Sequence, residues 1–146
     1  VLVDQDKLVV LSDFAHHPTA IAGALESLRA RWPDRRLIAC FEPRSNTAVT
    51  NVFEDRFADA LALADVGLLG AVHRAEKIPA DKRINPANMI QRIQDHGKSG
   101  HAFSTNEELE DFLKNYSFSE PALVVFFSNG SFDGVIGRFA ESVKKM

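Results

Sequence analysis

The sequence predicts an α/β fold, a Rossmann-like and mostly parallel sheet with helices on both faces. Short β-branched or aromatic runs alternate with segments of helical period along the chain, which is the pattern of βαβ units. The most hydrophobic run, 122–128, has the sequence ALVVFFS and is typical of a strand buried on both faces. A chain of 146 residues fits one domain.

The N-terminal part is predicted to be a hairpin followed by a helix. Apolar runs at 1–3 and 7–14 flank Asp4-Gln5-Asp6, so we expect a possible antiparallel N-terminal strand beside the second run. Pro18 suits the first turn of a helix, and apolar residues then recur every three or four positions up to Trp32. This apolar face consists of Ile21, Ala24, Leu25, Leu28 and Trp32.

The middle of the chain is predicted to repeat strand and helix. The expected elements are a strand at 36–43, a helix at 51–65, a strand at 66–72, a charged loop at 73–83 and a helix from the Asn85 cap to Gly97. A short strand at 100–104 then precedes a helix that begins at a capping box, Thr105 to Glu108. After the strand at 122–128, the segment NGSFDG leads into a last helix with Val135 and Phe139 on its inner face.

Composition excludes several classes of protein. A net charge of −3, with 17 basic and 20 acidic residues, has no basic footprint for nucleic acid. No apolar run is long enough to cross a membrane, and we expect a cytoplasmic protein. The single cysteine, Cys40, lies in a predicted strand and is expected in the core rather than as a nucleophile. Because the chain begins at Val1 within strand-like sequence, we expect it to be part of something longer.

Polar clusters follow three predicted strands: SDFAHHP, FEPRSNT and FSNGSFDG. The carboxyl ends of parallel strands lie on one edge of a sheet, and ligands bind there at the crevice where strand order reverses. We therefore expect the three clusters to form one ligand-binding edge.

The first cluster offers an acid and two histidines. Asp13 could accept hydrogen bonds from a ribose or orient a histidine, His16 could stack on a ligand ring, and His17 is expected at the helix N-cap. An alternative is that Asp13 and His17 only satisfy free N–H groups of the helix. Adjacent histidines in a turn do not converge readily on one ion, so no metal site is expected.

The second and third clusters suit an anion. Arg44 at a strand end is suited to bidentate recognition of a carboxylate or phosphate, and the alternative is an internal ion pair with Glu42. Small residues from Ser128 to Gly130 would let backbone N–H groups approach an anion at a helix N-terminus, and the alternative is an ordinary strand-to-helix turn.

These three segments resemble the C-terminal domain of the Mur ligases. DFAHHPTAI resembles the family's DYAHHP-type segment, and SNGSFDG resembles an SNGGFGG-type segment. FEPRSNT resembles the branch of the family that attaches the recycled tripeptide L-alanyl-γ-D-glutamyl-meso-diaminopimelate to UDP-N-acetylmuramate. Ser12, Ser131 and Asp133 depart from the family pattern.

The resemblance implies that residues 1–146 are the third domain of a three-domain ATP-dependent ligase. The UDP-binding domain and the central ATPase domain would precede this chain, and the central domain would hold most of the ATP and Mg²⁺. Asp13 would contact the ribose of ATP and His16 its adenine. The implied substrate-binding residues are Arg44, Ser45, Ser128, Asn129 and Gly130. The domain itself would supply no catalytic residue and would be inactive alone, acting by closure and positioning.

Three alternatives differ in what they predict. The same domain of the alanine-adding ligase would use free L-alanine. A non-catalytic α/β ligand-binding module would have no ATPase domain before it. A metal-dependent hydrolase using His16 and His17 would hold stoichiometric metal.

Overall fold

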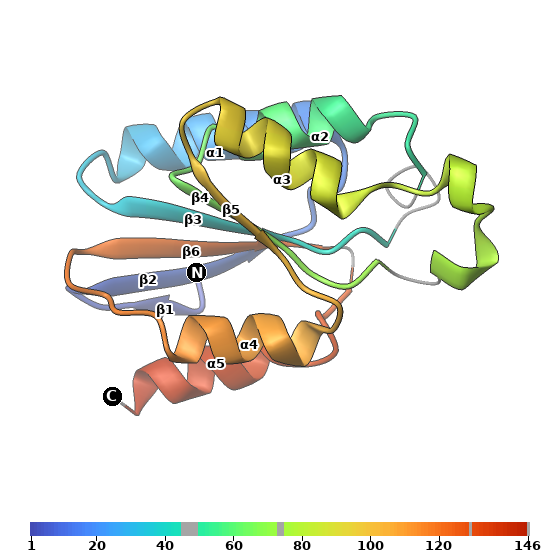
Figure 1. Cartoon of the computed structure of the whole chain (residues 1–146). Helices are drawn as coiled ribbons and strands as arrows, with labels where there is room; N and C mark the ends of the chain where they lie inside the picture. Colours follow the sequence, from blue (N-terminus) through green and yellow to red (C-terminus); the bar gives the residue numbers. More distant parts are fainter. Residues whose placement is uncertain (45–49, 73–74, 129, 146) are drawn as a thin grey trace.

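A computed structural model describes residues 1–44, 50–72, 75–128 and 130–145 as a six-stranded sheet with helices on both sides (Figure 1). The strands are β1 (Val3–Asp4), β2 (Leu8–Asp13), β3 (Arg36–Phe41), β4 (Val66–Leu69), β5 (Ser99–Ala102) and β6 (Ala122–Phe127). The helices are α1 (Pro18–Arg31), α2 (Glu54–Leu61), α3 (Pro86–Asp95), α4 (Asn106–Lys114) and α5 (Val135–Lys144). Short 3₁₀ turns, Ala75–Lys77 and Ala80–Lys82, lie in the predicted charged loop.

The sheet has the order β1-β2-β6-β3-β4-β5. β1 pairs with β2 antiparallel, and every other pairing is parallel, so the predicted hairpin and the mostly parallel sheet are both confirmed. β6 has no polar side chain and is buried along its whole length because it lies between two parallel neighbours with helices on both faces.

Two hydrophobic cores cover the two faces of the sheet. Helices α1, α2 and α3 lie on one face and α4 and α5 on the other (Figure 1). Alternate residues of β6 contribute to different cores, with Val125 and Phe127 on the first face and Val124 and Phe126 on the second, as the period of a strand requires. None of the helices in the described part of the chain is long and apolar enough to cross a membrane.

Two helices begin at the caps that the sequence predicts. The Asn85 side chain accepts a hydrogen bond from the N–H of Asn88 at 3.2 Å, and Thr105 accepts one from the N–H of Glu108 at 3.2 Å. Both predicted caps are therefore confirmed. The helix predicted at 51–65 is shorter, Glu54–Leu61, and the strand predicted at 66–72 ends at Leu69. Gly70 still donates its N–H to Phe41 but then turns away.

The three predicted clusters do meet on one edge of the sheet. Asp13, Phe127 and Phe41 are in register across β2, β6 and β3, and the ladder continues one residue further through Glu42 N–H to Phe127 O and Ser128 N–H to Asp13 O, both 3.1 Å. After β2 and β3 the chain passes to α1 and α2 on one face, whereas after β6 it passes to α5 on the other. Such a reversal of chain direction between faces is where open α/β sheets bind ligands.

Candidate functional site at the carboxyl edge of the sheet

A buried carboxylate lies at the centre of this edge. Glu42, at the end of β3, is only 3% exposed. Its Oε1 accepts hydrogen bonds from the Ser128 hydroxyl at 2.6 Å and from the Phe132 N–H at 3.1 Å. Its Oε2 accepts one from the Asn106 amide at 2.9 Å and lies 3.7 Å from a terminal nitrogen of Arg44. A buried charge must be hydrogen-bonded or paired, and Glu42 is both.

Asn106, the first residue of α4, extends this network to a third strand. Its amide nitrogen donates to Glu42 and, at 2.9 Å, to Asp133, while its oxygen accepts the Ala71 N–H at 2.9 Å. The side chain is 1% exposed, and all of its donors are used. A Cβ on Gly70 would lie 2.5 Å from the Asn106 oxygen, so this strand end must be glycine. Glu42 and Asn106 together tie the ends of β3, β4 and β6 to α4.

The segment between β6 and α5 adopts an unusual backbone that the network supports. Phe132 and Asp133 both have φ of 54°, and Gly134, the N-cap of α5, has φ of 85°. Two successive non-glycine residues in the left-handed region cost about 1 kcal/mol or more each. Burial of the Phe132 ring, the hydrogen bond that the Phe132 N–H donates to Glu42 and the one that Asn106 donates to the Asp133 carboxylate offset that cost.

A second buried carboxylate holds the far side of the same segment. Arg138 donates to Glu110 at 3.0 and 2.8 Å and to the Asp133 carbonyl at 3.0 Å. Lys114 lies 2.7 Å from the other oxygen of Glu110. The hydrogen bond from Arg138, followed by that from Lys114, holds the pKa of Glu110 below its ordinary value. The carboxylate is therefore charged at neutral pH.

The predicted anion position is occupied by the protein's own carboxylate. The Ser128 hydroxyl donates to Glu42 and accepts the Gly130 N–H at 2.9 Å, and Ser128 is 3% exposed. The N–H groups of Gly130 and Phe132 therefore point inward. Helix α5 begins at Val135, directly after the NGSFDG segment as predicted, so the N–H groups of Gly130 and Phe132 are not part of its first turn. Ser128 and Gly130 lie at the predicted edge, but their polar groups have internal partners.

Arg44 is the cation of this edge, and its side chain is 28% exposed. The predicted alternative, an internal pair with Glu42, is present, with a terminal nitrogen of Arg44 3.7 Å from Glu42 Oε2. The side chain lies against the backbone of Gly130, where an added Cβ would be 2.6 Å from Arg44 Nε. Arg44 is thus held from two sides and still reaches solvent, as a receptor for a carboxylate or phosphate must.

The first cluster is built by local hydrogen bonds instead. Asp13 Oδ1 accepts the Ala15 N–H at 2.7 Å, an Asx turn, and Oδ2 has no partner among the described residues. His16 is exposed, with Nδ1 2.9 Å from the Phe14 carbonyl oxygen. A carbonyl only accepts, so Nδ1 carries a proton and Nε2 is free to face a ligand. Phe14 itself is 78% exposed.

Helix capping does not explain this cluster. His17 is the N-cap of α1, as predicted, but its side chain makes no capping hydrogen bond and packs on the Phe53 ring at 5.5 Å. Asp13 bonds to a residue before the helix. The alternative in which both side chains satisfy the helix N-terminus is therefore wrong. Pro18 at the first helical position already removes one of the N–H groups that a cap would serve.

Two of the predicted site residues, Ser45 and Asn129, lie outside the described residues, and their roles stay predictions. Asn106 was not among the predicted site residues. A signal for it existed, because position 106 lies on the same stripe of α4 as the buried Leu109 and Leu113. A polar residue on an apolar stripe indicates a buried hydrogen-bonding role.

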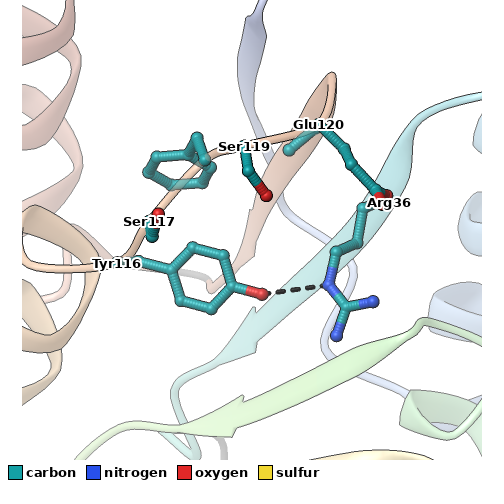
Figure 2. A pocket seen from close by; sticks show the side chains of 7 residues that line it. Arg36, Tyr116, Ser117, Ser119 and Glu120 are labelled. Carbon is teal, nitrogen blue, oxygen red and sulfur yellow. Dashed lines mark hydrogen bonds between the residues drawn. The ribbon is translucent and has the colours of Figure 1, made fainter.

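A separate pocket lies at the opposite, amino edge of the sheet. It has a volume of about 170 Å³ and is lined by Arg36 at the start of β3 and by the segment from Tyr116 to Glu120. Figure 2 shows two of the lining side chains joined by a hydrogen bond, in which Arg36 Nε donates to the Tyr116 hydroxyl at 2.9 Å. None of the predicted site residues that the structure describes lines it, and it is not on the edge where the carboxyl ends of the strands meet.

Cys40 lies in the core of the sheet. Cys40 is fully buried in β3, and burial raises the pKa of its thiol far above the ordinary value, so the expectation of a core cysteine is confirmed. Within the described part of the chain, no three His, Cys, Asp or Glu side chains gather closely enough to hold a metal ion.

Comparisons with known proteins follow this geometry. A family profile described as "Mur ligase, glutamate ligase domain" matches residues 1–130. A Methylococcus capsulatus protein named UDP-N-acetylmuramate–L-alanine ligase is 35% identical over 113 residues, 75% of this chain and 23% of that protein. A Phocaeicola vulgatus protein of the same name is 30% identical over 145 residues, 98% of this chain and 30% of that protein. The chain thus spans less than a third of the length of these curated relatives.

Solved structures show the same fold. A murein peptide ligase of Psychrobacter arcticus superimposes with a TM-score of 0.71 at 26% identity, covering 97% of this chain and 28% of that one. The UDP-N-acetylmuramate–alanine ligase of Thermotoga maritima gives a TM-score of 0.70 at 23% identity, covering 94% of this chain and 27% of that one. A single crystallised domain from Haemophilus ducreyi, named for the ligase that adds the diaminopimelate tripeptide, gives 0.66 at 21% identity and is covered over 93% of its length.

Proposed function

Because the chain belongs to the Mur ligase family, we propose that it is the third domain of a ligase that joins L-alanyl-γ-D-glutamyl-meso-diaminopimelate to UDP-N-acetylmuramate. The family's members are ATP-dependent amide-forming ligases. In the proposed arrangement a UDP-binding domain and a central ATPase domain belong to the same longer chain, in the cytoplasm, and serve peptidoglycan recycling.

The observation that supports a peptide substrate most is Arg44 at the end of β3. Its side chain is partly exposed at this edge of the sheet, within the segment Glu42-Pro43-Arg44 that resembles the peptide-adding branch. A tripeptide ending in diaminopimelate carries several carboxylates, and an Arg fork binds a carboxylate in two parallel hydrogen bonds. We assign Arg44 as the carboxylate receptor, with Ser45 and Asn129 as further proposed contacts.

Ser128 and Gly130 fit this proposal in a different way from the one the resemblance implied. The Ser128 hydroxyl and the Gly130 N–H bind within the protein, so we propose that they shape the receptor rather than contact the peptide through these groups. One lone pair on the Ser128 oxygen remains after these two bonds, but Ser128 is only 3% exposed.

The turn after β2 fits one end of ATP. Asp13 has one carboxylate oxygen without a partner among the described residues, which suits a ribose hydroxyl, and His16 presents an exposed ring, which suits the edge or face of adenine. Bound ATP supplies the phosphoryl group that activates the muramoyl carboxylate, with Mg²⁺ held mainly by the central domain. This domain's residues bind, orient and exclude water when the domains close.

The alanine-adding ligase is the second candidate. Both curated relatives above carry that name, and an Arg fork would also bind the carboxylate of free alanine. The two candidates differ in the size and charge of the amine substrate.

The test measures ADP release by the full-length ligase that contains this domain. The expected result is turnover with UDP-N-acetylmuramate and the tripeptide but not with L-alanine. Arg44→Ala should raise the KM for tripeptide about tenfold or more, because a charge-assisted contact is lost. Arg56→Ala, at an exposed arginine of α2, is the control.

Turnover with L-alanine alone would establish the second candidate. If ADP is released neither with the tripeptide nor with L-alanine, the ligase proposal is overturned and a ligand-binding module remains. Stoichiometric metal found by elemental analysis would indicate the hydrolase alternative.

A further inference from the structure

Arg44 is held in place by two groups that do not themselves face a ligand. One terminal nitrogen lies 3.7 Å from the buried Glu42 carboxylate, and the side chain from Cδ to Cζ lies over Gly130. We infer that Glu42 is a positioning residue for the amine substrate, acting through Arg44 with Gly130 as the surface that limits where the guanidinium can lie. This inference rests on the proposed role of Arg44 as a carboxylate receptor.

Glu42 cannot bind the substrate directly. It is 3% exposed, and both of its oxygens have protein partners. An anionic peptide would also be repelled by a free carboxylate at this edge. The Arg44 side chain is 28% exposed, so the guanidinium would lie between an internal carboxylate and the proposed external one. Among the described residues, no other cation forms an ion pair with Glu42.

The rest of the network explains why Glu42 has one fixed position. Ser128, Phe132 and Asn106 bind it from β6, the following turn and α4. The nearby Asp133 carboxylate, which departs from the family pattern, is held by Asn106 at 2.9 Å. Because Asp133 is held by Asn106, Glu42 is the carboxylate that pairs with Arg44.

A substitution at Gly130 would change the position of the Arg44 guanidinium independently of Glu42. A Cβ at this position would lie 2.6, 2.8 and 2.9 Å from Nε, Cδ and Cζ of Arg44. Because these atoms belong to the end of a flexible side chain, Gly130→Ala displaces Arg44 while removing no hydrogen bond and no charge.

The experiment is a double-mutant cycle in the full-length ligase, with KM measured separately for the tripeptide and for ATP. Glu42→Gln keeps the side-chain volume but replaces the oxygen facing Arg44 and Asn106 by an NH₂ group. We expect Glu42→Gln and Gly130→Ala each to raise the KM for tripeptide about fivefold or more and to leave the KM for ATP within twofold. In an Arg44→Ala background, neither should raise the tripeptide KM further.

The control is Asp65→Asn at the opposite edge, a half-buried carboxylate that also binds an arginine and a strand N–H. It should lower stability without a selective change in the tripeptide KM. If Glu42→Gln fails to fold, the Gly130→Ala cycle carries the test alone.

The possible failures are distinguishable. Effects of Glu42→Gln and Gly130→Ala that persist in the Arg44→Ala background would overturn the inference, since they would act on general structure or touch the substrate. An unchanged KM in both variants, with Arg44→Ala still harmful, would overturn the inference and leave the receptor intact. An Arg44→Ala variant with normal tripeptide KM would remove the receptor from the proposed function as well.

Discussion

The two halves of the carboxyl edge are built in opposite ways. The turn after β2 is held by bonds between residues two apart, Asp13 to Ala15 and His16 to Phe14, and its side chains remain largely open to solvent. The ends of β3 and β6 are joined by bonds between residues 64 to 90 apart in sequence, all to the buried Glu42. The first half leaves its side chains accessible, and the second uses most of its polar groups in bonds within the protein.

Polar side chains in a cluster at a strand end can therefore have two different structural roles. A polar group with only local partners can be changed at little cost to folding, since it orders few residues. A polar group that joins distant segments determines the shape of a site that it does not touch. The free energies of unfolding of single variants distinguish these two roles.

The largest expected effect is at Asn106. Asn106→Ala leaves the Ala71 N–H without its acceptor and removes a donor from Glu42 and Asp133, so we expect a loss of about 3 kcal/mol in the free energy of unfolding. Urea denaturation measures it. The matched control is Asn115→Ala at the other end of α4, an exposed amide bonded to Asp111, with a loss of about 0.5 kcal/mol or less. Equal losses would contradict the comparison.

A smaller effect is expected from acid. Arg138 lowers the pKa of Glu110, so the folded state binds its proton less readily than the unfolded state does. The stabilisation is complete above the ordinary pKa of 4.5 and is lost as the pH falls through the lowered value. We expect the urea concentration at the unfolding midpoint to decrease as the pH is lowered below 4.5. The decrease should be shallower in Glu110→Gln.

Glu141→Gln, at an exposed carboxylate of α5, should retain the wild-type slope. A Glu110→Gln slope as steep as the wild type would show that this carboxylate is not a source of the acid sensitivity.

The smallest effect on folding is expected in the turn after β2. His16→Ala and Asp13→Asn should change the free energy of unfolding by about 0.5 kcal/mol or less, because His16 is exposed and Asn retains the oxygen that accepts from Ala15. In the full-length ligase the same variants should raise the KM for ATP. A loss of stability comparable to that of Asn106→Ala would place this turn among the structural elements instead.

The strands, the helix starts and the meeting of three clusters were predictable because each depends on local pattern. β6 is recognisable from six apolar residues in a row, and the caps Asn85 and Thr105 from their own side chains. The sheet edge follows from parallel pairing alone.

The internal use of the third cluster was not predictable in this way. Whether Ser128 and the N–H of Phe132 face a ligand or Glu42 depends on contacts 86 and 90 residues apart. The left-handed backbone at Phe132 and Asp133 also lacks a local signal, because neither residue type favours that conformation as glycine does. Only the buried stripe position of Asn106 indicated that a polar network lay beneath the site.

The buried position of Cys40 makes its thiol an intrinsic probe of global unfolding. It is the only cysteine of the chain and lies fully buried in β3, between β6 and β4. Alkylating reagents attack the thiolate, so labelling must wait until the central strands separate. The rate of modification therefore reports global opening under native conditions, and every variant above can be timed without an added probe.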